Sequence, residues 1–293
     1  MIRTIALVFV ALFLIKASEA FAHGDLHERI ANITQEIKRS TDPVDLYVRR
    51  AELHSQHRDW TAARGDFVRA RSFTPPSKLL DFYEGRMEYK ARRPAVAITL
   101  LDRQLRAIPD HLSARLFRAR SEVQAGRLGD AIRDYDEILD RMENPSPDFY
   151  IERARAQVAN KVDVTKILNG IDRGSARLEP VVTLQIFALE LEMQHQRWAA
   201  ALRRIDRTLP TLPLQSPWLL HRGEVLVQLG RTEEARTAYS RALQQIEAIP
   251  ASRRQSRMFR SLTEKAHVAL AQLSGEQPKS GTRFDEEQDQ DSL

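Results

Sequence analysis

The sequence contains no cysteine, so it forms no disulfide bond and has no cysteine for lipid attachment. Glycine and proline are modest, at 11 and 13 of 293 residues, and runs of β-branched residues are scarce beyond residue 15. A glycine-rich phosphate loop, a nucleophile-elbow serine and paired metal-ligand motifs are also missing. These absences favour a helical, non-catalytic protein, so we expect no enzyme activity, cofactor or metal.

The first 22 residues have the pattern of a secretory signal peptide. Arg3 gives a positive start, an unbroken apolar run follows over 5–15, and Ala20-Phe21-Ala22 matches an A-x-A cleavage site. This run is too short to span about 30 Å of hydrocarbon. We therefore expect a soluble periplasmic protein that begins at His23 and does not stay in the membrane. The alternative is an uncleaved N-terminal anchor.

The net charge is positive, but its distribution argues against nucleic acid as a partner. The formal charge of +5 becomes +4 on export, because Arg3, Lys16 and Glu19 leave with the signal peptide. The sequence pI is about 9.6, yet the basic residues are mixed with acids and form no runs. An exported protein also rarely meets nucleic acid. We expect an acidic protein or envelope polymer as the partner instead.

One pattern recurs at a fixed interval in the middle of the chain. Ala63, Ala97 and Ala131 are 34 residues apart. A small residue precedes each by twelve positions and a large one follows each by four: Ala51, Gly85 and Ala119, and Phe67, Leu101 and Tyr135. Two antiparallel helices approach closely only where a small side chain lies at their crossing. The recurrence therefore indicates a repeated unit, and its small residues are candidates for such crossings.

This 34-residue pattern resembles the tetratricopeptide repeat (TPR). The resemblance implies an all-α fold, a right-handed superhelical solenoid of about six TPR helix–turn–helix repeats with N- and C-terminal capping helices. It is strong in the first, third and sixth copies and degenerate in the others. Gln104 and Leu189 replace small residues there, and the turn near Asn160 has one extra residue.

The repeat register also divides the chain. After the signal peptide we expect a capping helix in 23–41, the repeat array over 44–250, a capping helix in 251–273 and a disordered acidic tail over 274–293. Asp42 and Pro43 are expected as N-cap and first helical residue of the first repeat, whose helices run over 44–57 and 60–73. Ser252 is expected to cap the last helix.

In this family the first helices of successive repeats line a concave groove that binds the partner. The groove positions give this chain a basic centre with apolar neighbours, while Glu52, Glu190 and Glu224 lie toward its ends. The expected partner-binding residues are Phe82, Arg86, Tyr89, Lys90, Leu116, Arg120, Gln124, Ile151 and Arg155. The alternative is that these arginines pair with nearby acids in a solvated surface. Asp134 and Asp136 lie on a second helix, which faces outward in the family.

The resemblance implies a non-catalytic protein–protein interaction scaffold. We expect it to hold an extended or helical segment of an envelope protein in its groove, through an acidic stretch with an aromatic or aliphatic anchor. The alternative is a structural subunit of a secretion or cell-wall assembly that uses the convex face. The oligomeric state and occupancy of the groove by the chain's own acidic tail stay open. His23 and His27 are candidate metal ligands, but a solvated N-terminus is the simpler interpretation.

We expect N-terminal sequencing of the protein from its native host to give His23 as the first residue, and fractionation to place it in the soluble pool. The reason is the A-x-A motif and the polar residues that follow it. A Met1 terminus on membrane-bound protein would show instead that the apolar run is retained as an anchor.

Overall fold

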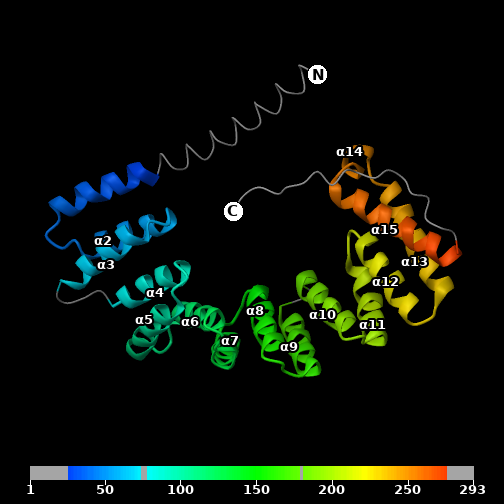
Figure 1. The fold of residues 1–293 in the computed structure, drawn as a ribbon, viewed down its shortest axis with the longest axis horizontal. Helices are drawn as coiled ribbons and strands as arrows, with labels where there is room; N and C mark the ends of the chain where they lie inside the picture. The colour runs from blue at the N-terminus through cyan, green and yellow to red at the C-terminus, as the bar shows by residue number, and fades with distance from the viewer. Residues whose placement is uncertain (1–25, 74–77, 179–180, 276–293) are drawn as a thin grey trace, which may run out of the picture. The chain divides into compact units, whose positions relative to one another are not determined.

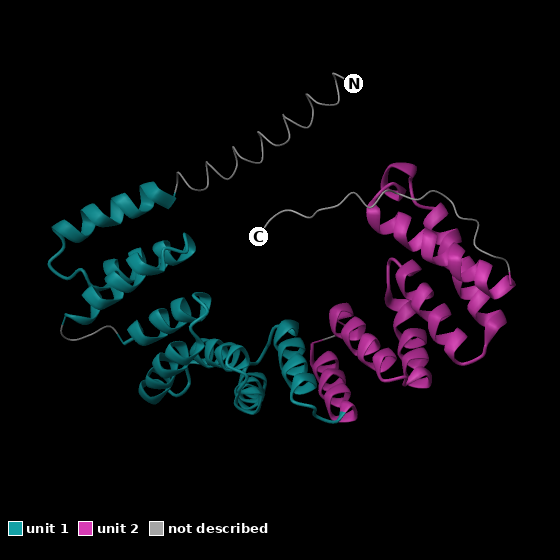
Figure 2. Cartoon of the chain, in the orientation of Figure 1, with its two compact units in different colours: residues 1–163 teal, residues 164–293 magenta. Residues whose placement is uncertain are grey.

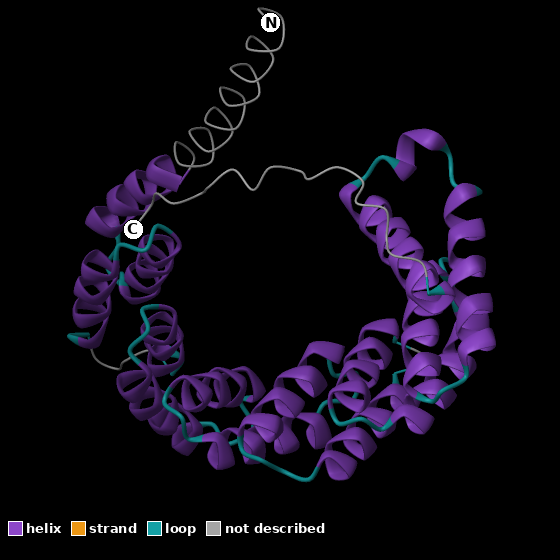
Figure 3. Ribbon diagram, turned by 45° about the vertical axis from the view of Figure 1, so that its right-hand side comes forward, coloured by secondary structure: helices purple, strands orange, loops and turns teal. Residues whose placement is uncertain are grey.

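The computed structural model describes residues 26–73, 78–178 and 181–275. Within these ranges every regular element is a helix, as Figure 1 and Figure 3 show. The all-α prediction is therefore confirmed for the described part of the chain. The proposed signal peptide over 1–22 and most of the acidic tail lie outside the described residues.

The helices fall into two compact units, residues 1–163 and 164–293 (Figure 2). In the described part of the first unit, a helix over 26–39 precedes the helices of the repeats. These are α2 (Val44–Gln56) and α3 (Trp60–Arg71), α4 (Leu80–Lys90) and α5 (Pro94–Ala107), α6 (Leu112–Gln124) and α7 (Leu128–Arg141), and α8 (Pro147–Ala159). The helices predicted over 44–57 and 60–73 are confirmed to within two residues.

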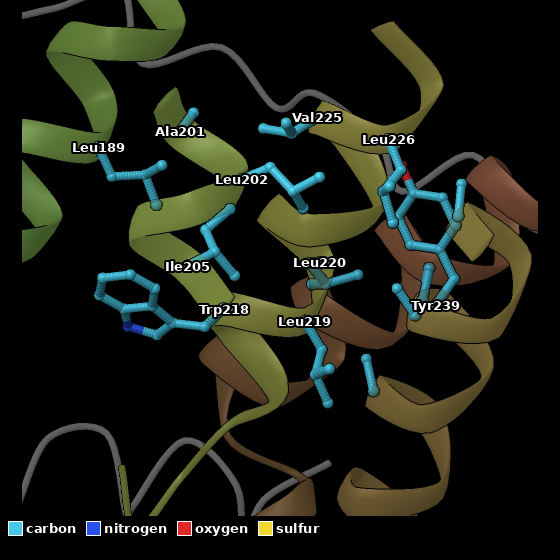
Figure 4. Packing of buried hydrophobic residues seen from close by; sticks show 14 of the residues in the cluster. Leu189, Ala201, Leu202, Ile205, Trp218, Leu219, Leu220, Val225, Leu226 and Tyr239 are labelled. Carbon is cyan, nitrogen blue, oxygen red and sulfur yellow. The ribbon is translucent and has the colours of Figure 1, made fainter. Parts of the chain in front are cut away.

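The second unit continues the same alternation of first and second helices. Its elements are α9 (Val164–Arg177), α10 (Val182–Gln194), α11 (Trp198–Thr208), the 3-10 turn η1 (Leu209–Thr211), α12 (Ser216–Gln228), α13 (Thr232–Glu247), α14 (Ala251–Arg254) and α15 (Arg257–Ser274). Leu189, Leu219 and Tyr239 belong to its core (Figure 4). Ala266 of α15 is buried in the same cluster, so α15 covers the apolar end of this unit.

Close helix crossings depend on small residues in the first helix of most hairpins, with Leu189 of α10 as the exception. Ala51 of α2 is completely buried. A Cβ atom added to Gly85 would lie 2.8 Å from Cγ of Leu101, and one added to Gly223 would lie 2.4 Å from Cε1 of Tyr239. The bulky residue of the repeat pattern thus packs directly on the small residue of its own hairpin. This contact sets how closely the two helices approach.

The departure from the pattern at Gln104 has a structural role. Its side chain is buried, and its Oε1 accepts a 3.2 Å hydrogen bond from the backbone N–H of Phe82. Phe82 lies in the first turn of α4, where backbone N–H groups have no partner within the helix. No side chain at the N-cap position of α4 supplies one. Gln104 therefore provides a capping acceptor that a small residue could not.

The start of the first repeat differs from the prediction. Pro43, rather than Asp42, is the N-cap residue of α2, and it makes no side-chain capping bond. The backbone N–H of Asp42 instead donates to Oγ of Ser40. Helix α2 begins at Val44, as the predicted range 44–57 has it, but Pro43 is its N-cap and not its first helical residue.

The single C-terminal capping helix predicted over 251–273 is also wrong. The chain forms the short α14 and then the longer α15, with a break between them. Ser256 has an extended backbone and its hydroxyl accepts from the N–H of Phe259, so Ser256 rather than Ser252 caps the last helix. The last helix therefore starts after Ser256, four residues downstream of the predicted N-cap.

We expect Gly223→Ala to destabilise the protein by about 1–3 kcal/mol, because the new Cβ would overlap the ring of Tyr239. Gly65→Ala is the matched control. Gly65 lies inside α3 with no atom within 4 Å of an added Cβ, so this change should stabilise by about 0.5–1 kcal/mol. Urea midpoints measure both effects. A Gly223→Ala protein as stable as Gly65→Ala would show that the α12–α13 crossing is not close.

Candidate functional site

The predicted partner-binding residues lie on first helices of the first unit. Helix α4 packs against both α2 and α6, so these three first helices are neighbours. Arg86 on α4 and Arg120 on α6 occupy equivalent positions, 34 residues apart, and Arg155 has the corresponding place on α8. The repeat geometry therefore places all three arginines on first helices, but their surroundings differ.

Arg86 interacts mainly with its own neighbours. Its guanidinium forms an ion pair with Glu52 of α2. It also lies 5.4 Å from the ring centroids of Phe82 and Tyr83 and 5.9 Å from that of Phe117, within cation–π range. Burial lowers the pKa of the Arg86 guanidinium. Its charge is therefore balanced by the chain itself.

Arg120 is paired in a similar way. Its Nε and Nη2 donate to the two carboxylate oxygens of Glu152 on α8, at 2.9 and 2.7 Å, and the hydroxyl of Tyr135 donates to Glu152 at 2.8 Å. Burial alone would raise the pKa of Glu152, but the hydrogen bonds from Arg120 and Tyr135 hold it below its usual value. The alternative interpretation, in which the arginines pair with nearby acids, thus applies to Arg86 and Arg120.

Phe82 does not present an exposed ring. It is 7% exposed and belongs to a core cluster with Leu101, Leu105 and Ala114. Its ring centroid lies 4.6 Å from that of His111. Phe82 therefore contributes to packing between α4, α5 and α6, which corrects its assignment as a groove anchor.

Leu116 and Ile151 are both partly buried. Leu116 packs against a core cluster that contains Ala119, Tyr135 and Ile138, so most of its apolar surface is already covered. Ile151 lies on α8 with intermediate exposure. Neither residue lines the two cavities that open beside the first helices.

Two adjoining cavities lie within the first unit. The first has a volume of about 650 Å³ and lies at the turns that follow α2 and α4, and we call it the turn cavity. The second has a volume of about 430 Å³ and lies along α6, α7 and α8, and we call it the helix cavity. Tyr89, Arg92 and Gln124 line both cavities, so one ligand could extend from one into the other. Their volumes lie within the usual range for ligand sites.

The turn cavity is basic. Arg58, Lys90 and Arg92 line it together with the rings of Trp60 and Tyr89, and no carboxylate of the described residues does so. Partial burial and the nearby charge of Arg86 lower the pKa of Lys90. An anionic group in this cavity would meet three cations and no opposing acid.

The helix cavity is basic on one side and apolar on the other. Arg120 and Arg155 line it, together with the carboxylate of Glu152. The exposed side chain of Val123 contributes apolar surface. The Oε1 atom of Gln124 is buried and has no hydrogen-bond partner in the described part of the chain.

Of the expected partner-binding residues, the cavities are lined by Tyr89, Lys90, Arg120, Gln124 and Arg155, so the assignment of these five to a binding surface stays a prediction. Sequence reasoning missed three residues, Arg58, Trp60 and Arg92, because they lie in or just after the hairpin turns. A signal was present, since Gly126 and Gly230 occupy the positions equivalent to the two arginines.

Buried arginine–carboxylate pairs were also missed. Arg50 donates to Asp66 at 2.8 and 2.6 Å, and two repeats later Arg118 donates to Asp134 at 2.7 and 2.6 Å. Asp66 and Asp134 are both buried. The prediction that Asp134 faces outward is therefore wrong, although Asp136 beside it is half-exposed. Such bidentate pairs fix the orientation of the first helix on the second.

Glu122 is a buried carboxylate without a close donor. Burial and the charge of Asp134 raise its pKa to about 7, and Arg118 and Arg127 only partly offset this. The nearest cationic nitrogen, on Arg127, is 3.7 Å away, and one oxygen of Glu122 has no partner among the described residues. The equivalent Glu88 differs, because Arg64 donates to both of its oxygens at 2.7 and 2.9 Å.

The candidate metal ligands do not form a site in the part of the chain that the structure describes. The rings of His27 and His57 are in contact, with centroids 4.6 Å apart, while His23 lies outside the described residues. The described ranges contain no group of three or more histidine and acidic side chains arranged to hold a metal ion. In the same ranges, no helix is both long and apolar enough to cross a bilayer.

Comparison with known proteins identifies a family. The tetratricopeptide repeat model matches residues 84–159 and 189–252. These segments include α5 to α8 in the first unit and α11 to α13 in the second. A search of curated proteins gave no match.

Solved structures share the fold. A tetratricopeptide repeat protein from Parabacteroides merdae is 13% identical, with 86% of this chain and 96% of that chain covered and a TM-score of 0.51. The C-terminal part of a TPR repeat-containing protein from Cytophaga hutchinsonii is 15% identical, with 78% of this chain and 93% of that chain covered and a TM-score of 0.62. At such identities the likeness concerns the fold alone.

We expect Glu122→Gln to stabilise the protein at pH 8 by on the order of 1–3 kcal/mol and to change little at pH 5. The folded-state pKa of Glu122 is raised to about 7 from the ordinary 4.5. The protonated carboxyl of Glu122 therefore contributes its full stabilisation of the folded state below about pH 4.5, and this contribution is lost as the pH rises through about 7. Glutamine does not ionise, so the Glu122→Gln protein does not lose this stability at high pH. Urea midpoints of the parent and the variant at the two pH values measure the difference in stability.

Glu88→Gln is the control for this experiment. It leaves the guanidinium of Arg64 without its charged partner, so it should destabilise the protein at both pH values. If Glu122→Gln shifts the midpoint equally at pH 5 and pH 8, Glu122 is ionised normally in the folded protein.

Proposed function

Because this chain is a tetratricopeptide repeat protein, we propose that it is a non-catalytic scaffold that binds an extended or helical segment of another protein. The proposed binding surface is the face of the first helices in the first unit. The single observation that carries the proposal is the pair of adjoining cavities on this face, which share Tyr89, Arg92 and Gln124. Binding of other proteins is also the general role of the family.

The lining chemistry supports a peptide ligand. A protein-bound segment needs acceptors and donors for its backbone and pockets for its side chains. The side-chain amide of Gln124 lines both cavities and offers polar contact to a peptide backbone, and Val123 with Leu128 and Ala156 offers apolar contact for one side chain. Tyrosine and arginine, which both line these cavities, are enriched among the residues that dominate protein interfaces.

The partner that fits this surface has an acidic stretch. Three cations line the turn cavity and three line the helix cavity, with Arg92 common to both, against one carboxylate at Glu152. Charge complementarity of this kind raises the association rate and disfavours basic partners. An aliphatic or aromatic residue beside the acidic stretch would contact the apolar side of the helix cavity.

We further propose that the scaffold acts in the periplasm on an envelope protein. This rests on the signal-peptide pattern of residues 1–22 and on the absence of cysteine from the sequence. The alternative, a structural subunit that binds through its second helices, is kept as an outcome of the test below.

Two exposed valines of the first unit allow a matched test. Val123 lies on the first helix α6 and lines the helix cavity, whereas Val68 lies on the second helix α3 and is 66% exposed. We expect the partner captured from native envelope to bind the Val123→Glu protein at least ten times more weakly, because a carboxylate then repels its acidic stretch. Binding to Val68→Glu should stay within about two-fold.

Titration of the purified partner against both variants measures the effect, and circular dichroism checks that each variant is folded. Binding should also weaken as salt is raised, because charge attraction contributes to it. Loss of binding by Val68→Glu with none by Val123→Glu would contradict the proposal and favour the structural-subunit alternative.

A further inference from the structure

Each hairpin turn contains one residue in the left-handed region of the backbone. It follows the C-cap of the first helix and has φ between 55° and 74° at Arg58, Arg92, Gly126, Lys161, Gln196 and Gly230. At Arg92 the backbone N–H donates to the carbonyl of Tyr89 at 3.1 Å, and the next N–H, of Arg93, donates to that of Glu88 at 2.9 Å. This is the Schellman arrangement, in which glycine is the usual residue.

A side chain at such a position strains the folded state. In the left-handed region the Cβ atom of an L residue crowds the following carbonyl oxygen, and glycine avoids this. Gly126 and Gly230 occupy two of the equivalent turns, so the fold accepts glycine there. Arg58 and Arg92 keep large side chains where glycine would relax the backbone. Strain of this kind is often found at functional sites. Lys161 and Gln196 share it, so a functional role for Arg58 and Arg92 depends on what surrounds them.

Both strained arginines line the turn cavity. Lys90, at the end of α4, lines it between them, and the rings of Trp60 and Tyr89 provide flat apolar surface. Two successive repeats thus place equivalent turn residues, Arg58 and Arg92, around one cavity of about 650 Å³. A side chain at one turn alone could not form this cluster.

These cations lack the carboxylate partners that other basic residues of the same unit have. Arg64 donates to Glu88 at 2.7 Å, and Arg93, adjacent to Arg92, lies 3.6 Å from it. In contrast, no carboxylate in the described ranges lies within 4.0 Å of the charged nitrogens of Arg58, Lys90 or Arg92. Three like charges around one cavity repel one another, so an anionic ligand would relieve a cost that the free protein carries.

We propose that the turn cavity is the carboxylate-binding site that selects acidic partners. It holds adjacent acidic side chains of the segment that occupies the groove, through Arg58, Lys90 and Arg92. This inference rests on the proposed scaffold function and its acidic partner, and it adds which residues bind the carboxylates of that partner. The cations come from the edge of the groove, in and beside the hairpin turns, and not from the paired arginines Arg86 and Arg120.

The two cavities also set an order along the bound segment. Because Arg92, Tyr89 and Gln124 line both, the segment passes from the turn cavity directly into the helix cavity. Its acidic residues occupy the first and an aliphatic residue contacts Val123 in the second. A recognised sequence therefore contains two adjacent acidic residues and, after a short separation, an aliphatic residue.

The test uses defined probes and the full chain. The first probe is a fluorescein-labelled hexapeptide, Glu-Glu-Asp-Glu-Glu-Leu, and its neutral counterpart is Gln-Gln-Asn-Gln-Gln-Leu. Fluorescence anisotropy measures their affinities at low and high salt. Vesicles of phosphatidylglycerol form a separate arm, because a basic cavity could also meet an anionic lipid surface.

Replacing the strained residues by glycine removes the cations without harming the fold. We expect the double variant R58G/R92G to bind the acidic hexapeptide at least ten-fold more weakly than the parent, with a melting temperature equal to or above the parent's. Q196G is the matched control, since it relaxes the same backbone position in the second unit and removes no charge. It should bind the peptide as the parent does. K161G removes a turn cation outside the cavity and should also leave binding unchanged.

Three results would overturn the inference. They are equal binding of the acidic and neutral peptides by the parent, unchanged binding by R58G/R92G, and tighter binding of phosphatidylglycerol vesicles than of the peptide through these two residues. The proposed scaffold function is tested separately from this inference. If the captured partner is lost by Val123→Glu but kept by R58G/R92G, the scaffold proposal stands and the turn cavity is not its selective site.

Discussion

The architecture of the repeats depends on a close contact between a small residue and a large one, which is clearest at Gly85 and Gly223. Gly223 lies so near the ring of Tyr239, and Gly85 so near Leu101, that even a methyl group would overlap. With the crossing point fixed in this way, the remaining faces of each helix pair must cover the next pair, as Figure 4 illustrates for the second unit. Buried pairs such as Arg118 with Asp134 then add directional hydrogen bonds that fix the rotation of one helix on the other.

The proposed ligand chemistry lies at the ends of the first helices. On the helical faces most charges are balanced, as with Arg86 beside Glu52 and Arg120 beside Glu152. At the hairpin turns the backbone must take a left-handed conformation whatever the residue, so its side chain is freed from helix packing and can face a ligand. Arg58 and Arg92 use this freedom. In the proposed account, the free energy of binding an anion offsets the conformational cost of their left-handed backbone.

The sequence predicted the helices of the repeats well, because small and large residues at a 34-residue spacing reflect the same contact that the structure shows at Gly85 and Gly223. It predicted charge balance poorly. Position on a helix gives the direction of a side chain but not its partner from another repeat. The sequence therefore offered pairing of Arg120 only as an alternative, without identifying Glu152, 32 residues away, and it missed the burial of Asp134. Helix starts failed where two nearby caps compete, as Ser252 and Ser256 do.

Hydrogen–deuterium exchange of the full chain, with and without the acidic hexapeptide, tests the central claim most directly. Our account predicts slower exchange on peptide binding in three segments of the first unit, 55–60, 89–93 and 120–125, which contain the turn cavity and its junction with the helix cavity. The equivalent turn over 195–198 should exchange at an unchanged rate. Protection confined to the second helices α3, α5 and α7, or to the second unit, would contradict it.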